Sequence, residues 1–148
     1  MMRRFLYLMG CVCLLAVSSC ELYTSHNGDL DGYWHLIGVD TLSTGGYLDM
    51  SERLVFWGIQ TNLVEAVDHD NDPTHYGYIF YFEKNDHSLR IFNAHKHDRP
   101  NGDIKLQDAA EIAPLGINSI DHVFEITYLN SDKMILVDEK LQLTFRKQ

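Results

Sequence analysis

The first strongly β-forming stretch of this 148-residue chain is Gly32-Tyr-Trp-His-Leu-Ile-Gly-Val-Asp40. Aromatic and branched apolar residues dominate it, and such residues favour a pleated, half-buried strand. A polar leader precedes the stretch, and further strand-like segments follow it as far as Arg146. We therefore expect Tyr33–Asp40 to be the first strand of a small antiparallel barrel.

The residues at the start of the chain predict an export signal and a lipid anchor. A basic head at positions 3 and 4 precedes an almost continuously apolar run, Phe5–Val17, which has the length of a signal-peptide core rather than of a membrane span. The run ends in Val17-Ser-Ser-Cys20, which resembles a bacterial lipobox. We expect residues 1–19 to be a lipoprotein signal peptide and Cys20 to be the lipidated N-terminus. The alternative is an ordinary secretory signal with an incidental cysteine.

Cysteine usage and length indicate one domain without disulfide bonds. Cys11 and Cys13 lie in the expected signal peptide, so Cys20 has no disulfide partner in the mature chain. An exported domain of this kind depends on its core alone. Residues 20–148 suit a single domain, which at this size buries roughly two-thirds of the surface that its unfolded chain exposes.

The mature chain is strongly acidic. The whole sequence has a net charge of −9; without the arginines at positions 3 and 4, 10 Lys and Arg stand against 21 Asp and Glu, which gives −11 with His neutral. Such a chain repels phosphate backbones and anionic lipid, so we do not expect nucleic acid as a partner. Membrane attachment must then come from acyl chains on Cys20. The acidity keeps an exported protein soluble, and a basic protein partner stays open.

Residues 20–31 are expected to form a flexible tether between the lipid and a barrel domain at 32–148. They are polar and lack periodicity. Glu21 stands alone, without the acidic run that often follows the cysteine in surface-exported lipoproteins. We therefore expect a protein of the cell envelope, on the outer membrane and facing the periplasm, with surface exposure as the alternative.

Seven further segments are expected to form strands, because they are rich in β-branched and aromatic residues or alternate between apolar and polar side chains. They are 53–67, 76–84, 88–93, 103–107, 122–129, 133–137 and 140–146. The first exceeds the usual strand length, and Gly58 sits where a bend would break it, so it is one bent strand or two. Loops are expected at 41–51, 68–74 and 94–120, the last with one helical turn over 108–113, before Pro114.

Alternation and strand count together predict the fold class. Phe124, Ile126 and Tyr128 share one face of their segment, as do Leu143 and Phe145 further on, which is typical of strands that are wet on one side. We expect an all-β fold, a single antiparallel up-and-down β-barrel of about eight strands with little helix. Eight strands enclose a space that side chains or one small ligand fill. A two-sheet sandwich is the alternative.

Several short motifs occur in a fixed order along the chain. They are Cys20, Gly32-Tyr33-Trp34, Phe56-Trp57, Pro114-Leu-Gly-Ile117, Ser131-Asp-Lys-Met-Ile-Leu136 and Leu143-Thr-Phe-Arg-Lys147. With these motifs the chain resembles the lipocalin-like lipoproteins of Bacteroidota, a family largely without assigned function. The resemblance covers nearly the whole mature chain and implies a lipocalin-like barrel. The chain departs from true lipocalins because it has no helix after the last expected strand.

The same resemblance implies a structural pair at the barrel floor. In lipocalins the Trp of the Gly-x-Trp opening closes the floor, and an Arg of the last strand lies across it, which implies a pair of Trp34 with Arg146. A guanidinium over an indole is a cation–π contact worth about 0.5–2 kcal/mol. Alternation, however, places Arg146 opposite the core-facing Leu143 and Phe145. Either the strand end twists or the pair is absent.

Eight histidines and an Asp-rich turn raise the question of a metal site. His95 and His97 share a face if their segment is extended, and His69 and His75 flank the turn Asp68-x-Asp70-x-Asp72. No set has the spacing of a zinc site, and the turn lacks the glycine and glutamate of an EF-hand loop. We expect solvated histidines and aspartates that cap their own backbone, with no metal and no cofactor.

No catalytic constellation stands out in the sequence. A Gly-x-Ser-x-Gly nucleophile elbow is missing, and the one mature cysteine is expected to be acylated. Carboxylates are abundant, but they lie in turns, and nothing singles out a catalytic pair. We therefore do not expect an enzyme.

Aromatic residues supply the candidate ligand site. They are expected to line a barrel cavity, with tyrosine hydroxyls that orient a ligand; the alternative is that the rings simply fill the barrel. The candidates for the cavity wall are Trp57, Tyr76, Tyr78, Phe80, Phe82, Phe124 and Tyr128.

Two functions follow from these patterns. The first is non-covalent binding of a small, partly apolar molecule in the barrel cavity of a lipid-anchored envelope protein, with the 94–120 loop as a flap. The second is a protein-binding accessory or inhibitor lipoprotein with a solid barrel core. The first rests partly on fold analogy.

Overall fold

The computed structural model describes residues 25–72, 74 and 76–148. The expected signal peptide, Cys20 and the first part of the expected tether lie outside the described residues, as does His75.

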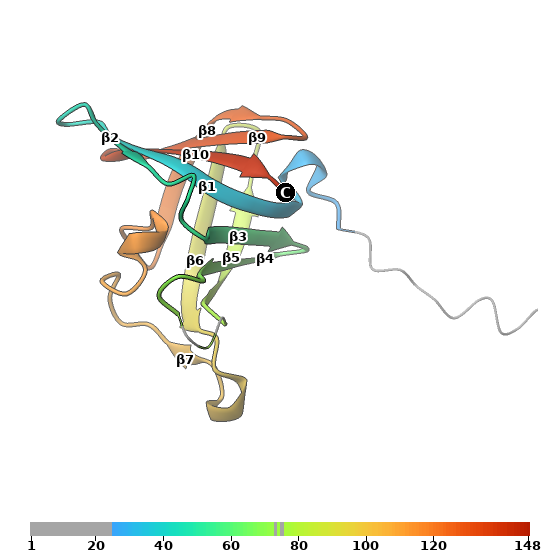
Figure 1. The fold of residues 1–148 in the computed structure, drawn as a ribbon. Helices are drawn as coiled ribbons and strands as arrows, with labels where there is room; N and C mark the ends of the chain where they lie inside the picture. The colour runs from blue at the N-terminus through green and yellow to red at the C-terminus, as the bar shows by residue number, and fades with distance from the viewer. Residues whose placement is uncertain (1–24, 73, 75) are drawn as a thin grey trace, which may run out of the picture.

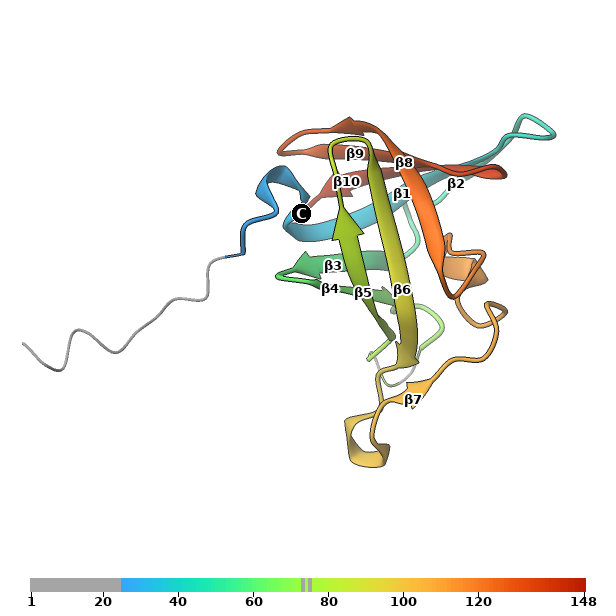
Figure 2. The same ribbon diagram turned by 180° about the vertical axis from the view of Figure 1, so that it is seen from behind.

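Eight antiparallel strands follow one another around a closed barrel (Figures 1 and 2). Each strand pairs with the next along the chain, and the last pairs with the first to close the ring. This meander confirms the up-and-down barrel and excludes the sandwich. The strands are β1 (Gly32–Thr41), β3 (Val55–Gln60), β4 (Leu63–Asp68), β5 (Tyr78–Lys84), β6 (Ser88–Lys96), β8 (His122–Leu129), β9 (Lys133–Val137) and β10 (Leu141–Lys147).

Two short strands lie outside the ring. β2 (Gly46–Asp49) pairs with the end of β1, and the two form an arm that projects from the barrel (Figure 1). β7 (Ile104–Lys105) pairs with the end of β6. The expected loop at 41–51 is therefore wrong in part, because its second half is β2.

The long segment 53–67 is two strands, and the expected bend at Gly58 is wrong. β3 and β4 are joined at Thr61 and Asn62, where Thr61 adopts a positive φ of 57°. Gly58 lies inside β3, opposite Tyr33 of β1. A turn of two residues between paired strands gives a tight hairpin, which leaves no room for a single bent strand.

Over the residues that the structure describes, the helical segments are three turns of 3-10 type: η1 (Gly28–Leu30), η2 (Arg99–Asn101) and η3 (Ala113–Leu115). In the part of the chain that the structure describes, none of the helical segments has the length and apolar character needed to cross a bilayer. The helical turn expected over 108–113 is displaced, because η3 begins at Ala113 and takes Pro114 into its first turn, where proline is well tolerated.

Bulges shift the alternation of side chains in β1, β6 and β8. On β6, Asn93 has a positive φ of 56°, and Ala94 rather than Asn93 then faces the core. On β8, the register shifts between Ile126 and Tyr128. Tyr128 therefore points outward and is exposed, so the face that it was expected to share with Phe124 is wrong. A bulge inserts one residue on one strand only, which reverses the facing of every residue beyond it.

The barrel interior is filled by side chains. Trp57 lies at its centre, with ring centroids 5.8 Å from Phe124 and 5.0 Å from Phe145. All three rings are fully buried, as is Phe80. Burial of each such ring stabilises the fold by about 1.5–3 kcal/mol relative to an exposed one.

The floor of the barrel is closed by the segment before β1. Leu30 of η1 is fully buried, and the Trp34 indole donates a hydrogen bond of 2.8 Å to its carbonyl oxygen. Lys147, not Arg146, lies over the Trp34 ring, with Nζ 4.5 Å from the centroid. Lys147 shares the face of Phe145 because it lies two residues further along β10, whereas Arg146 points outward. The strand end does not twist, and the implied pair of Trp34 with Arg146 is absent.

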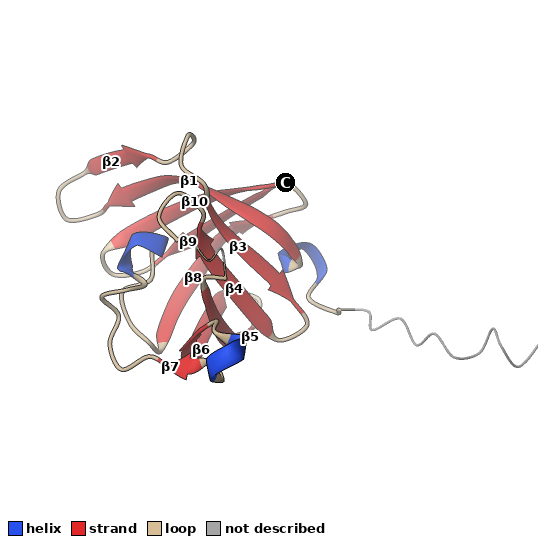
Figure 3. Cartoon of the chain, turned by 60° about the horizontal axis from the view of Figure 1, so that its bottom comes forward, coloured by secondary structure: helices blue, strands red, loops and turns tan. Residues whose placement is uncertain are grey.

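The opposite end of the barrel is covered by residues 97–121, which carry η2, β7 and η3. Figure 3 brings β7 and η2 forward, with the helical turns in blue. Four apolar side chains of this segment reach the core: Leu106, Ile112, Leu115 and Ile117. The Trp57 indole donates a hydrogen bond of 3.1 Å to the carbonyl oxygen of Leu115, which ties the cover to the barrel centre.

Candidate functional site

A cavity of about 310 Å³ opens at the covered end of the barrel, and we call it the mouth cavity. The loop between β4 and β5 forms one wall, and the start of η3 forms another. The residues that line it are Asp68, Asn71, Asp72, Tyr78, Lys96, Glu111, Pro114 and Leu115. Apolar and charged groups therefore meet in one space.

Three side chains give the mouth cavity its chemistry. Tyr78 and Lys96 are direct cross-strand partners on β5 and β6. The Tyr78 hydroxyl donates a hydrogen bond of 3.0 Å to Glu111, whose carboxylate also lies 3.8 Å from the Lys96 ammonium. Burial, the hydrogen bond to Glu111 and the carboxylate charges of Glu111 and Asp72 raise the pKa of Tyr78 to about 12. Tyr78 is thus a neutral donor at physiological pH, beside the Lys96 ammonium and the carboxylates of Glu111 and Asp72.

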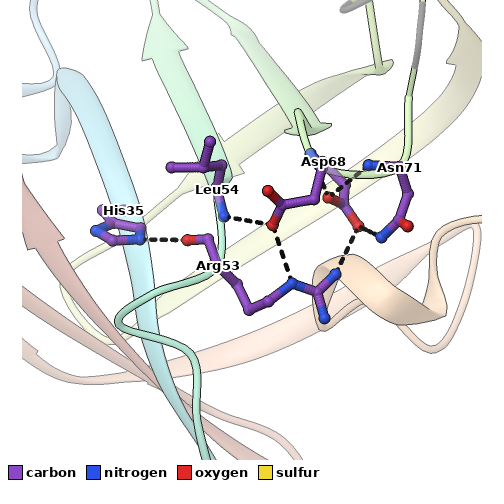
Figure 4. Close-up of polar contacts among 6 residues, drawn as sticks. His35, Arg53, Leu54, Asp68 and Asn71 are labelled. Carbon is purple, nitrogen blue, oxygen red and sulfur yellow. Dashed lines mark hydrogen bonds and ion pairs between the residues drawn. The ribbon is translucent and has the colours of Figure 1, made fainter.

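A polar network joins β1 and the residues before β3 to the β4–β5 loop, which forms one wall of the mouth cavity (Figure 4). The His35 ring donates from Nε2 to the Arg53 carbonyl oxygen at 2.7 Å. The Arg53 guanidinium in turn reaches Asp70 at 2.9 Å and Asp68 at 3.4 Å. The backbone amide of Leu54 and the Arg53 side chain hold the pKa of Asp70 below its ordinary value. The network fixes the start of the β4–β5 loop against β3.

The Asp-rich turn uses its carboxylates on its own chain. Asp68 accepts hydrogen bonds from the amides of Asp70 and Asn71 and from the Asn71 side chain, the last at 2.7 Å. Asp72 accepts hydrogen bonds from the amides of Thr74 and Gly77. Over residues 25–72, 74 and 76–148, no three His, Cys, Asp or Glu side chains are grouped so as to hold a metal ion. These aspartates cap local backbone, as such turns commonly do.

The candidate residues for the cavity wall do not share one surface. The structure places Trp57, Phe80, Phe82 and Phe124 in the packed interior. Of the three tyrosines, Tyr78 alone lines the mouth cavity, whereas Tyr76 and Tyr128 are exposed elsewhere. The Trp57 and Phe124 rings contact each other, and all four side chains belong to the packed core.

Sequence reasoning missed Lys96 and Glu111. Lys96 faces the mouth because the bulge at Asn93 shifts the alternation of β6, and a bulge leaves no clear mark in a single sequence. Glu111 comes from the irregular segment 97–121, whose path depends on where Leu115 and Ile112 are buried. A signal was available only for Tyr78, as an aromatic residue at the start of the strongest strand.

Comparisons with known proteins agree with the closed eight-stranded barrel. A family model described as a lipocalin-like domain matches residues 13–148. The chain belongs to the lipocalin-like domain family. No curated protein matches its sequence.

Two solved structures share the lipocalin-like fold. A lipocalin-like protein from Bacteroides uniformis superposes with a TM-score of 0.61 at 17% identity, over 82% of this chain and 100% of the other. An uncharacterized protein from Bacteroides eggerthii superposes with a TM-score of 0.54, also at 17% identity, over 80% of this chain and 98% of the other. At this identity the similarity shows a common fold, and this fold suggests ligand binding in general.

Proposed function

We propose that this lipocalin-like protein is a lipid-anchored protein of the cell envelope that binds a small, partly apolar molecule at the mouth of its barrel. The observation that carries the proposal is the mouth cavity, where Tyr78, Lys96 and Glu111 surround a space that is backed by Leu115. Ligand sites of proteins combine an apolar lining with a few such polar groups, which fix the orientation of the ligand.

The cover segment 97–121 gives the ligand a route inward. Beside the mouth cavity it is held by the exposed hydrogen bond from Tyr78 to Glu111, and deeper in the barrel by the bond from Trp57 to Leu115. Further along the segment, β7 pairs with β6. Exposed polar contacts are worth little, so the outer part of the cover opens more easily than the part around Leu115. We propose that it acts as the flap, with the ligand's polar group at Lys96 and its apolar part against Leu115.

The location of the protein rests on its first twenty residues. The basic head, the apolar run and the Val17-Ser-Ser-Cys20 ending support export and acylation of Cys20. We propose anchoring in the outer membrane on the periplasmic side. We propose binding without turnover, because the mouth cavity offers a hydroxyl, an ammonium and a carboxylate that already satisfy one another.

Native mass spectrometry tests the proposal directly. Residues 21–148 are exported to a bacterial periplasm, incubated with envelope extract of the native organism, and weighed before and after organic extraction. We expect an added mass that extraction removes. Tyr78→Ala and Lys96→Ala should each reduce the occupied fraction. Tyr128→Ala and Lys84→Ala, at exposed positions outside the mouth cavity and the cover segment, should not. A protein that keeps its bare mass in native extract would contradict ligand binding.

The β1–β2 arm favours a second function, the binding of a protein partner. Leu42, Tyr47 and Leu48 are exposed on it, and among the described strands β2 pairs with β1 alone. The stretch 40–52 holds three acidic residues and no Lys or Arg. An open strand edge with apolar and acidic side chains suits an added strand from a basic partner.

A photo-crosslinker at Leu48 tests the second function in intact cells. We expect one adduct with a basic protein. The adduct should not form when the envelope is washed with high salt before irradiation, since exposed charge contacts are screened. The same crosslinker at Val123, an exposed position on β8, serves as the control. Equal adducts from both positions would count against a docking arm.

A further inference from the structure

A second hollow, larger than the mouth cavity, lies on the outside of the barrel. It measures about 600 Å³ and crosses the outer face of β1, β3, β4 and β5; we call it the outer groove. Tyr33, Gly58, Gln60, Glu65, Ile79 and Arg99 contribute to its walls. It shares no lining residue with the mouth cavity, so it is a separate candidate site.

A fixed aromatic ring borders one end of the outer groove. Phe56 covers one face of the Tyr33 ring, with centroids 4.8 Å apart and planes at 8°, and His35 stacks on the far side of Phe56. The Tyr33 hydroxyl lies 3.1 Å from Nε2 of His69. Gly58 is directly opposite on β3, and a Cβ there would already lie 3.5 Å from the ring. The stack on Phe56 and the hydrogen bond with His69 hold the Tyr33 ring in place, and Gly58 leaves room for it. Tyr33 nevertheless stays 41% exposed.

Paired charged groups border the other end. The Glu65 carboxylate accepts a hydrogen bond of 2.7 Å from Nδ1 of His97, whose ring packs against Tyr76. The Arg99 guanidinium approaches Nε2 of the same His97 ring at 3.4 Å. Tyr33 and Glu65 both line the outer groove, and burial and the charge of Glu65 raise the pKa of Tyr33. Donors and acceptors thus face a polarisable ring across the groove.

We propose that the outer groove binds a neutral saccharide. One face of a pyranose ring carries C–H groups that pack on the negative face of an aromatic ring, and Tyr33 presents such a ring without further reorganisation. Sugar hydroxyls both donate and accept, which matches a carboxylate and a guanidinium at the far end, where charged groups form the stronger hydrogen bonds. A groove that crosses four strands takes more than one sugar unit.

Charge and the cost of desolvation argue against two other classes of ligand, phosphorylated molecules and acyl chains. A phosphorylated ligand meets a chain of net charge −9, and Glu65 lies inside the groove itself. An acyl chain would displace water from the exposed Glu65 and Arg99 without replacing the hydrogen bonds of that water, which is costly. A neutral polyhydroxylated ligand meets neither penalty.

Calorimetric titration tests the inference on the mature chain, purified in a detergent without a sugar headgroup. The probes are maltohexaose, cellohexaose and chitohexaose. We expect at least one to bind, and Tyr33→Ala and Glu65→Ala each to weaken that binding about tenfold, since one aromatic contact or one hydrogen bond to a charged group is of that order. Tyr33→Phe keeps the stacked ring and should retain most of the affinity.

Tyr81→Ala is the matched control. Tyr81 is also 41% exposed and also packs beside a phenylalanine, Phe92, but it lies outside the groove. It should leave saccharide affinity unchanged, as should Tyr78→Phe at the mouth. Absence of binding for all three probes, or an equal loss from Tyr33→Ala and Tyr81→Ala, would overturn the assignment. Failure here leaves the mouth proposal intact, because the two sites are read by different variants.

Discussion

The Asp138 carboxylate, in the turn between β9 and β10, accepts three hydrogen bonds. Its side chain is only 6% exposed, and it accepts from the amides of Lys140 and Leu141 at 2.6 and 2.7 Å and from His122 at 2.8 Å. Burial alone would raise its pKa, but these hydrogen bonds and the nearby His122 together hold the pKa of Asp138 below the ordinary 3.8. The folded state therefore prefers the ionised form.

We predict that Asp138→Asn lowers the free energy of unfolding at pH 7 by about 2 kcal/mol, the value of hydrogen bonds to a charged group. Because the folded pKa is depressed, the unfolded chain binds more protons between that pKa and 3.8, and stability falls as the pH falls through this window. The difference between wild type and variant should be constant above pH 5 and shrink below about pH 4. Urea denaturation across this range measures it.

Glu139→Gln supplies the control for this carboxylate. Glu139 is the next residue in the same turn, but it is exposed. An exposed substitution of this kind changes stability by no more than about 0.5 kcal/mol. A loss as large as that of Asp138→Asn, or a deficit of Asp138→Asn that does not shrink as the pH falls below about 4, would contradict the role assigned to the buried carboxylate.

Single residues also show where sequence reasoning succeeds and stops. Family resemblance implied a floor role for Trp34, and the structure buries this ring fully and bonds it to the Leu30 carbonyl oxygen. Its cation was assigned to Arg146 by family resemblance, although alternation from Phe145 already pointed to the next residue of the same face, Lys147. Lys147 also donates from Nζ to the carbonyl oxygens of Asp29 and Asp31, at 2.7 Å each. Those acceptors lie in a segment without periodicity, so no sequence pattern predicts their contact with Lys147.

At the scale of elements, alternation predicted the strands but not their bulges. The bounds of β8 and β9 match the expected segments, because strict apolar–polar alternation marks a strand that is wet on one side. The shift within β8 depends on how β9 pairs beside it, and a single strand does not encode its neighbour's register. That is why Tyr128 was placed in the cavity wall and Leu129, which packs on the core, was not.

The cover segment 97–121 carries the element-scale prediction. Ile112 is fully buried in it, and Ile112→Ala should lower the free energy of unfolding by about 2–5 kcal/mol, as expected when a core methyl cluster is removed. Ile104→Ala makes the same chemical change at a residue of β7 that is exposed, and should cost much less. Chemical denaturation of both variants decides whether the cover is part of the folded unit. Equal, small losses would mean that it is a loose loop.

At the scale of the whole molecule, the ring of strands is closed at one end by the floor and at the other by the cover. The floor uses residues 25–31, part of the expected tether, and the structure packs this part against the barrel through Leu30. The cover uses residues from the longest irregular segment. Strand patterns predicted the ring of strands. The floor and the cover were not predicted, because they depend on which apolar side chains of irregular segments pack into the two ends of the barrel.

Leu30→Ala tests whether the segment before β1 belongs to the barrel. The variant leaves a cavity beneath Trp34, and we predict a loss of about 2–5 kcal/mol in the free energy of unfolding. Indole fluorescence, which reports on Trp34 and Trp57, and far-ultraviolet circular dichroism should still give coincident urea transitions, as one cooperative unit requires. Leu42→Ala, on the exposed arm, is the matched control. If Leu30→Ala is as harmless as Leu42→Ala, residues 25–31 are a tether after all, and the barrel supplies its own floor.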